Sequence, residues 1–116
     1  MMKVLIADDN ASMRRMIRSV IQPVAEEIFE CADGGEAIEI YDQIYPDWVL
    51  MDFGMPRVDG LTAIRRIIDR NPKARILLVT QHDDEDLRQA AREAGAKGFV
   101  LKDNLFSLRA TINKTL

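Results

Sequence analysis

Five short apolar runs recur along the chain, and longer segments with helical periodicity separate them. The runs comprise residues 4–7, 28–31, 48–51, 76–79 and 99–101. They are continuous rather than alternating, which is typical of strands that other elements cover on both faces. Strands that alternate with helices five times favour a parallel sheet with right-handed crossovers. The sequence therefore predicts an α/β fold with five strands and five helices.

The segments between the runs place apolar residues on one face of a helix. The first such face consists of Met13, Met16, Ile17, Val20 and Ile21. Asn10 is a candidate N-cap for this helix and Pro23 a candidate stop. The other four faces are expected to contain Ala37, Tyr41 and Ile44; Leu61, Ile64, Ile67 and Ile68; Leu87, Ala90, Ala91 and Ala94; and Leu105, Leu108 and Ile112. We expect the second helix to begin after residues 34–35, the third to end near 71–72 and the fourth to begin near 83.

The size and charge of the chain limit the classes of function. Its 116 residues are about one domain's worth, so we interpret residues 1–116 as a single domain. A formal net charge of -3 gives no sign of the positive field that direct binding to nucleic acid requires. Basic residues at helical spacing are interpreted as solvated faces without a partner: Arg14, Arg15, Arg18, Arg65, Arg66 and Arg70.

The sequence favours a reducing compartment. Cys31 is the only cysteine, so it cannot form an internal disulfide, and we interpret it as a small buried residue. No apolar run approaches the roughly 18 residues that cross a bilayer. Asp8 and Asp9 interrupt the N-terminal apolar run at once, which argues against a signal peptide. We expect a cytoplasmic protein with no membrane contact of its own.

Polar residues directly follow four of the apolar runs and are the candidates for a functional site. Asp8 and Asp9 follow the first run, and Asp52 follows the third. Thr80 follows the fourth run and Lys102 the fifth. In a sheet of this kind, ligands bind at the carboxyl ends of the strands, near the point where the strand order reverses. We therefore expect these five residues to converge on one edge.

Three carboxylates gathered at one edge require a positive partner. Two of them at about 4 Å repel by roughly 4 kcal/mol at an effective dielectric constant of about 20. Oxygen donors with no histidine or cysteine beside them favour a hard ion such as Mg²⁺, which also suits sites shared with phosphate. Thr80 could donate a hydrogen bond to a phosphoryl oxygen, and Lys102 could supply a compact positive charge to it.

The ordered set of motifs resembles the response-regulator receiver family. The resemblance rests on Asp8-Asp9, the run DFGMPRVDG at residues 52–60, Thr80, Phe99 and Lys102. These motifs occur in the family's order and at its spacings, and they cover the whole chain. The resemblance implies a doubly wound, flavodoxin-like sheet with strand order 2-1-3-4-5, of which chemotaxis receivers are a known example.

The resemblance also implies a role for each site residue. Asp52 would accept a phosphoryl group, and Thr80 and Lys102 would hold its oxygens. The Mg²⁺ ligands would be Asp9, Asp52, the backbone carbonyl of Gly54 and, mostly through water, Asp8. The donor would be a phosphohistidine on a histidine kinase or phosphotransfer protein. The chain would then be the signalling switch of a two-component phosphorelay, catalysing only its own phosphorylation and slow dephosphorylation, rather than an enzyme.

Phe99 and Thr80 form a hypothetical two-state element. In receivers, an aromatic at the Phe99 position commonly turns inward when the hydroxyl at the Thr80 position moves toward the phosphoryl group. We expect the pair to couple the site to the face formed by the fourth helix, the fifth strand and the fifth helix. An output domain or target protein, which the sequence does not identify, would bind there. A homodimer through this face is compatible with the sequence, but nothing in the sequence supports one.

Three positions depart from the family pattern. Asp103 stands where a proline with a cis peptide usually follows the lysine, and a cis bond without proline costs about 3 kcal/mol. We therefore predict a trans bond and a less fixed Lys102. Gln81 replaces a small residue after Thr80, and Gly54 offers no side chain to shield the phosphorus. These two changes affect the lifetime of a phosphoryl group in opposite directions.

Two alternative functions follow from the same residues. Gln81 and Asp103 leave open a receiver-like interaction module with impaired phosphorylation. An Asp-nucleophile phosphohydrolase of the haloacid-dehalogenase type would also use Mg²⁺ and an α/β sheet. That class carries an Asp-x-Asp motif at the end of its first strand, and residues 8–10 lack this spacing.

Overall fold

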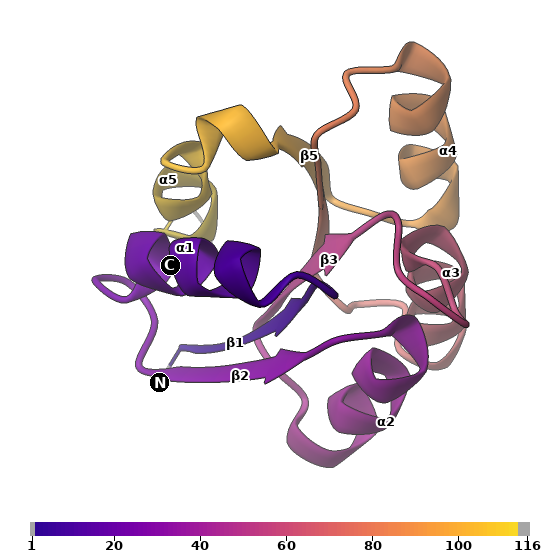
Figure 1. Ribbon diagram of the computed structural model, residues 1–116. Helices are drawn as coiled ribbons and strands as arrows, with labels where there is room; N and C mark the ends of the chain where they lie inside the picture. Colours follow the sequence, from indigo (N-terminus) through magenta and orange to yellow (C-terminus); the bar gives the residue numbers. More distant parts are fainter. Residues whose placement is uncertain (1, 114–116) are drawn as a thin grey trace.

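The computed structural model describes residues 2–113, in which five strands form one parallel sheet (Figure 1). The strands are β1 (Lys3–Ala7), β2 (Glu27–Cys31), β3 (Trp48–Asp52), β4 (Ile76–Thr80) and β5 (Gly98–Leu101). Their order across the sheet is β2-β1-β3-β4-β5. Each predicted apolar run lies within a strand that is one residue longer. The predicted α/β class and strand order are confirmed.

Helices cover both faces of the sheet. On one face lie α1 (Ala11–Ile21) and α5 (Ser107–Asn113). On the other lie α2 (Gly34–Ile44), α3 (Gly60–Arg70) and α4 (Glu85–Ala94), as Figure 1 shows. Within residues 2–113, no helix is long and apolar enough to cross a bilayer.

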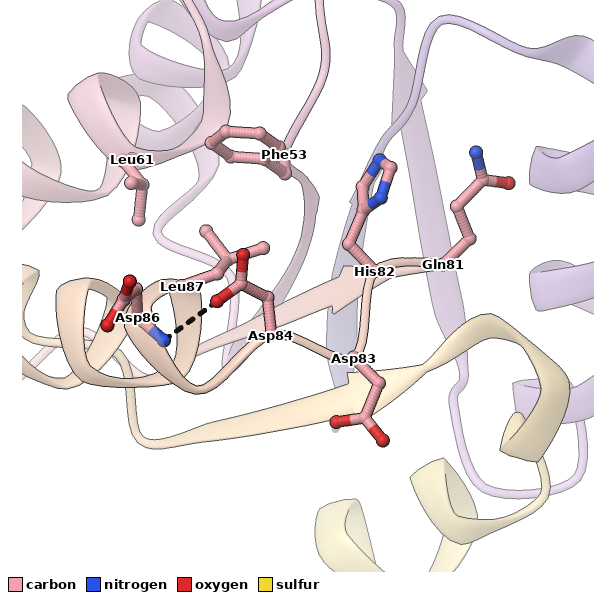
Figure 2. A pocket seen from close by; sticks show the side chains of 8 residues that line it. All are labelled: Phe53, Leu61, Gln81, His82, Asp83, Asp84, Asp86 and Leu87. Atoms are coloured by element: carbon pink, nitrogen blue, oxygen red, sulfur yellow. Dashed lines mark hydrogen bonds between the residues drawn. The ribbon is translucent and has the colours of Figure 1, made fainter.

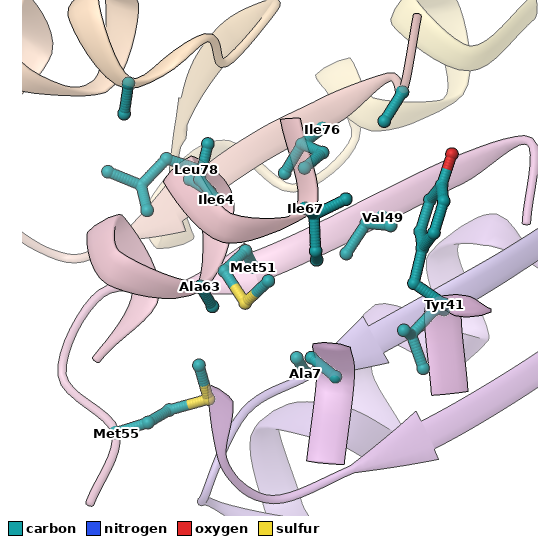
Figure 3. Close-up of a cluster of buried hydrophobic side chains, with 14 of the residues drawn as sticks. Ala7, Tyr41, Val49, Met51, Met55, Ala63, Ile64, Ile67, Ile76 and Leu78 are labelled. Carbon is teal, nitrogen blue, oxygen red and sulfur yellow. The ribbon is translucent and has the colours of Figure 1, made fainter. Parts of the chain in front are cut away.

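Two apolar clusters fill the spaces between the sheet and these helices. Successive residues of β1 belong to opposite clusters, because side chains alternate across a strand. Leu5 packs with Met51 on the side of α2, α3 and α4, whereas Ile6 packs with Ile17 on the side of α1 and α5. Figure 3 shows part of the first cluster. Burial on both faces explains why the apolar runs are continuous.

Polar side chains cap the N-termini of four helices. The caps are Asn10, Asp33, Asp59 and Asp84. The N-cap predicted at Asn10 is confirmed, and its side chain accepts a hydrogen bond from the backbone N–H of Met13 at 2.9 Å. The prediction that α2 begins after residues 34–35 is wrong by two residues. Asp33 supplies a cap one residue earlier, so both glycines lie inside the helix.

Several residues of the predicted apolar faces are less buried than expected. Met16 is 55% exposed, so it lies outside the face that Ile17 and Ile21 bury. α5 begins only at Ser107, after a short 3-10 helix, so Leu105 is buried in the turn before it. Other predicted face residues are only partly buried: Met13, Val20, Ile44, Leu61, Ile68 and Ala90. The remaining members form the core beneath each helix.

The entry into α3 lies directly against the end of β3. A Cβ atom at Gly60 would lie 2.0 Å from the carbonyl oxygen of Asp52. The backbone N–H of Gly60 also donates to the carbonyl oxygen of Phe53 at 3.0 Å. Only a glycine permits this approach. The close contact fixes the β3–α3 loop beside Asp52.

Candidate functional site

The carboxyl ends of the strands surround a hollow of about 270 Å³. Its lining consists of Asp8, Asp9, Asn10, Asp52, Gly54, Thr80, Gln81, His82 and Lys102. β1, β3, β4 and β5 are successive neighbours in the sheet, so residues at their ends are brought to one edge. The predicted convergence is confirmed for the two aspartates after β1 and for Asp52, Thr80 and Lys102.

Three carboxylates face one another in this hollow. One oxygen each of Asp8, Asp9 and Asp52 lies within 4.8 Å of the other two. Asp8 and Asp52 are buried, whereas Asp9 is exposed. The Lys102 ammonium lies 2.9 Å from Asp8 Oδ2 and 2.9 Å from Asp52 Oδ1. Among the lining residues, three carboxylates therefore face one ammonium group.

The surroundings of the site shift two pKa values upward. Burial is the main cause for Asp52, whose pKa is raised further by the charges of Asp8 and Asp9 and lowered by Lys102. Burial alone would lower the pKa of Lys102, but its pairing with Asp52 and Asp8 outweighs burial and raises that pKa. The surroundings therefore disfavour the ionised form of Asp52 relative to the protonated form, and an additional cation would stabilise the ionised form.

The donor atoms of the site fit Mg²⁺. Asp8 Oδ2 is buried, and its positive partner among residues 2–113 is the Lys102 ammonium, which it shares with Asp52. A buried carboxylate oxygen in this state favours a cation. The three clustered side chains offer oxygen atoms only, as a hard ion requires. Asp8, Asp9 and Asp52 would hold such an ion, with Gly54 lining the same hollow.

The side chains opposite the carboxylates come from the end of β4 and the loop that follows. Thr80 is buried, and its Oγ1 accepts a hydrogen bond from the backbone N–H of His82 at 3.2 Å. The hydroxyl hydrogen is left to donate elsewhere. Gln81 and His82 point to the same side of the loop, whereas Asp83 points away (Figure 2). His82 also makes an edge-on ring contact with Phe53.

Comparison with known proteins identifies the family. The sequence matches the response regulator receiver domain over residues 4–113. The chain belongs to this family. Receiver domains are signalling switches of two-component systems, and they bind Mg²⁺ at an acidic pocket like the cluster of Asp8, Asp9 and Asp52. The resemblance predicted from the sequence is confirmed.

The relatives of this receiver include both short and long proteins. Chemotaxis protein CheY of Bacillus subtilis is 36% identical over 116 residues, covering 98% of this chain and 97% of CheY. The uncharacterized transcriptional regulatory protein YhcZ of the same organism is 38% identical over 104 residues, covering 88% of this chain. The match covers only 49% of YhcZ, so the chain spans about half the length of that relative.

A solved structure with the same fold is CheY of Borrelia burgdorferi, in a complex described as CheX–CheY–BeF3–Mg²⁺. It is 25% identical to this receiver with a TM-score of 0.88, and the match covers 99% of this chain and 90% of that one. The fold of this receiver is therefore that of a protein solved with magnesium and a beryllium fluoride group.

Lys102 reaches the site of this receiver without the usual proline after it. No cis peptide bond occurs within residues 2–113, so the predicted trans bond between Lys102 and Asp103 is confirmed. The Lys102 side chain is only 15% exposed, and its ammonium pairs with two buried carboxylates. The replacement of proline by Asp103 therefore does not keep Lys102 from the hollow.

Phe99 lies on β5 outside the hollow. Its ring is partly buried, and the guanidinium of Arg88 on α4 lies 4.3 Å from the ring centroid. Arg88 also pairs with Asp83 in the β4–α4 loop, at 3.1 Å. One arginine thus connects Phe99 to the loop that begins just after Thr80.

Sequence reasoning missed two ion-pair networks beside the site. Arg14 and Arg18 were interpreted as part of a solvated face with no binding partner molecule, and that interpretation did not include their ion pairs within the chain. Both bind Glu30 on β2, at 3.0 Å and 2.7 Å. Asp33 also pairs with Arg57 in the β3–α3 loop. Helical spacing gave no signal for these pairs, because each joins segments that only the sheet brings together.

Proposed function

We propose that this receiver accepts a phosphoryl group on Asp52 from a phosphohistidine of a histidine kinase or phosphotransfer protein. The observation that carries the proposal is the position of the Lys102 ammonium, 2.9 Å from both Asp52 Oδ1 and Asp8 Oδ2. A cation at this point neutralises the acceptor carboxylate, which must approach an anionic donor. The proposal takes residues 1–116 as a single receiver domain.

The transfer is a displacement at phosphorus. An oxygen of Asp52 bonds to phosphorus while the bond to the donor's imidazole nitrogen breaks, and the electron pair of that bond stays on the nitrogen. A carboxylate is a weak nucleophile, so the step depends on alignment and charge neutralisation more than on proton transfer. A bound Mg²⁺ supplies Lewis-acid neutralisation of the phosphoryl oxygens. The residues that would hold it are Asp8, Asp9, Asp52 and, through its backbone carbonyl, Gly54.

Thr80 and Lys102 would bind the oxygens of the transferred group. Thr80 Oγ1 accepts a hydrogen bond from the His82 N–H, so its own hydroxyl hydrogen can be donated to a phosphoryl oxygen. Lys102 already contacts Asp52, and a small rotation would place its ammonium against the new anionic oxygens. The same two residues therefore serve the transfer and detect its product.

Thr80 and Phe99 would form the element that reports phosphorylation. Inward movement of the Phe99 ring would break its contact with Arg88 and change the face made by α4, β5 and α5. Phe99→Ala is expected to leave phosphoryl uptake intact while removing the change in amide signals along α4. An unaltered α4 response in this variant would show that Phe99 is not part of the switch.

The output partner would bind the α4–β5–α5 face, and it is either a target protein or an attached output domain. Both arrangements have counterparts among the relatives. The Borrelia CheY was solved with CheX, and YhcZ is a transcriptional regulator about twice as long as the match. We propose no direct contact with nucleic acid for this chain, because its net charge is -3.

Incubation with Mg²⁺ and acetyl phosphate tests the proposed function. Intact-protein mass spectrometry should detect one added phosphoryl group on the wild type and none on Asp52→Asn or after chelation of Mg²⁺. A second outcome is that the wild type takes up no phosphoryl group and that its amide signals near Asp52 do not change when beryllofluoride is added. That result would identify a receiver-like interaction module instead. Sustained turnover of a generic phosphate ester would identify a phosphohydrolase.

Two substitutions determine how the departures from the family pattern affect the phosphoryl lifetime. Gln81→Ala removes a side chain that lines the hollow and is expected to shorten the lifetime. Gly54→Asn adds a side chain where a Cβ atom meets nothing within 4 Å, and it is expected to lengthen the lifetime. The decay rate of the phosphorylated protein measures both effects.

A further inference from the structure

Three hydrogen bonds fix the turn that carries Asp8 and Asp9. The backbone N–H of Asp8 donates to the carbonyl oxygen of Cys31 at 3.1 Å. Asp8 Oδ1 accepts from the backbone N–H of Asn10 at 2.9 Å. The carbonyl oxygen of Asp8 accepts from Arg14 Nη1 at 2.7 Å. The third bond comes from a side chain outside the turn, so it can be removed by a substitution that leaves Asp8 and Asp9 unchanged.

The bond from Arg14 determines the plane of the peptide that links the two aspartates. A peptide unit is planar, so the direction of the Asp8 carbonyl also sets the orientation at which the chain enters Asp9. Both aspartates contribute an oxygen to the carboxylate cluster. A metal site tolerates only small errors in the direction of its ligands. The Arg14 contact therefore affects the orientation of both Asp8 and Asp9.

Glu30 holds Arg14 in the orientation that this contact needs. Arg14 Nε donates to Glu30 Oε1 at 3.0 Å, while Nη1 of the same guanidinium reaches Asp8. Glu30 lies on β2 opposite Ile6 of β1, two residues before Asp8. The Arg14 side chain is 21% exposed and that of Glu30 is 28% exposed, so solvent competes only partly with these bonds. A planar guanidinium can make both bonds at once, which a lysine cannot.

Arg18 provides a natural control for this arrangement. It donates to the other carboxylate oxygen of Glu30 at 2.7 Å and to the carbonyl oxygen of Ile28 at 3.3 Å. Both Ile28 and Glu30 belong to β2. Arg14 and Arg18 thus share one partner and one helix, but only the Arg14 contacts include the turn of Asp8.

We propose that Arg14, oriented by Glu30, is a positioning residue for the Mg²⁺ site of this receiver. The inference rests on the proposed function in taking Asp8 and Asp9 as metal ligands. Arg14 touches neither the metal nor the phosphoryl group. It acts by holding the backbone from which the two carboxylates project.

Titration of Mg²⁺ alone, followed by calorimetry or by amide signals of residues 8–9, tests the inference. Arg14→Met is expected to weaken Mg²⁺ binding about 10-fold. Arg18→Met should change the affinity less than about twofold while losing similar stability in urea, because each variant removes one ion pair to Glu30. Glu30→Gln should fall between them. If Arg14→Met does not fold, Arg14→Lys, which keeps the charge but not the double contact, is expected to show a smaller loss of affinity.

The outcomes separate this inference from the proposed function. Equal affinities of Arg14→Met and Arg18→Met would overturn the positioning role even if the wild type takes up a phosphoryl group. A wild type that binds no Mg²⁺ would overturn it too. Selective weakening in Arg14→Met would support the positioning role even if Asp52 is never phosphorylated, in which case only the proposed function fails.

Discussion

On the α1 side of the site, Arg14 and Glu30 are mostly shielded from solvent, and Arg14 donates to the carbonyl oxygen of Asp8, directly after β1. On the α4 side, Arg88 reaches the Phe99 ring and an aspartate, Asp83, whose side chain is 68% exposed. Both helices thus use an arginine to reach the site region. The first arginine contacts backbone that carries site residues, and the second contacts an aromatic side chain and a loop.

The difference separates a fixed half of the molecule from a movable half. Exposed ion pairs and a single cation–π contact are each worth about 1 kcal/mol or less. Contacts of that size can break and re-form when a ligand arrives, whereas shielded hydrogen bonds to backbone resist change. The apolar residues that α4 buries are Leu87, Ala91 and Ala94, of which two are small. We infer that the contacts beside β1 keep the carboxylate cluster in a fixed position. We also infer that α4 and its loop move when a ligand binds at that cluster.

Gly60→Ala should cause the largest loss of stability, because it disrupts the closest backbone contact in the fixed half. The new Cβ atom would lie 2.0 Å from the carbonyl oxygen of Asp52, so backbone must move. We expect a loss of about 3 kcal/mol or more in the free energy of unfolding, measured in urea. Gly54→Ala in the same loop is the control, since its Cβ meets nothing within 4 Å. A stable Gly60→Ala would show that this junction is not rigid.

Lys102→Met should destabilise the protein by about 2–3 kcal/mol, because it leaves buried carboxylates without their cation. Added Mg²⁺ should restore part of that loss, since it would supply positive charge to the same oxygens. Phosphoryl uptake from acetyl phosphate should fall by about 100-fold or more. Thermal unfolding with and without Mg²⁺ measures the stability effect. No rescue by Mg²⁺ would mean that the ion does not bind among these carboxylates.

Glu30→Gln and Asp52→Asn should change stability with opposite signs. Burial raises the pKa of Glu30, but Arg18 and Arg14 outweigh it and lower that pKa below 4.5. Its stabilising contribution is therefore present above pH 4.5 and lost as the pH falls through the lowered pKa. Glu30→Gln should cost about 1–2 kcal/mol at neutral pH. That cost should shrink in acid.

Asp52 behaves in the opposite way, because burial raises its pKa above 3.8. The contribution of Asp52 to stability is fully present below pH 3.8 and is lost as the pH rises through the raised pKa. The ionised carboxylate therefore opposes folding at neutral pH. Asp52→Asn should stabilise the protein by about 1 kcal/mol at neutral pH, because it removes a charge that burial disfavours. This gain should fade in acid. Urea unfolding from pH 3 to pH 7 would contradict the account if both variants changed in the same direction.

Arg88→Met should have the smallest effect, about 0.5–1 kcal/mol, because it removes one cation–π contact and one exposed ion pair. Arg14→Met should cost more, and the ratio of the two losses measures how different the two halves are. Amide hydrogen exchange should show faster opening of α4 in Arg88→Met with no change in β1. Equal losses would remove the distinction between the halves.

The sequence predicted the sheet and the core of the site for a clear physical reason. Buried parallel strands must be apolar throughout, so a polar residue at the end of a run marks both the strand end and the ligand edge. Asp52 and Thr80 were located in this way, each at the last position of its strand. The position of Lys102 followed from the same rule.

The supporting contacts were not predictable, because they depend on the register between strands. Glu30 reaches Arg14 only because β2 lies beside β1 with Ile6 opposite Glu30. Met16 fitted the helical pattern, yet its side chain is 55% exposed to solvent. Periodicity identifies a face of a helix but does not show how wide the buried part of that face is.

Amide hydrogen exchange with and without Mg²⁺ and beryllofluoride tests the division into a fixed and a movable half most directly. We expect changed exchange in the loop after Thr80, in α4 and around Phe99 of β5. We expect little change in β2 and in the first turn of α1, where Arg14 binds the Asp8 carbonyl. Changes of similar size in α1 and α4, or changes confined to α1, would contradict this division.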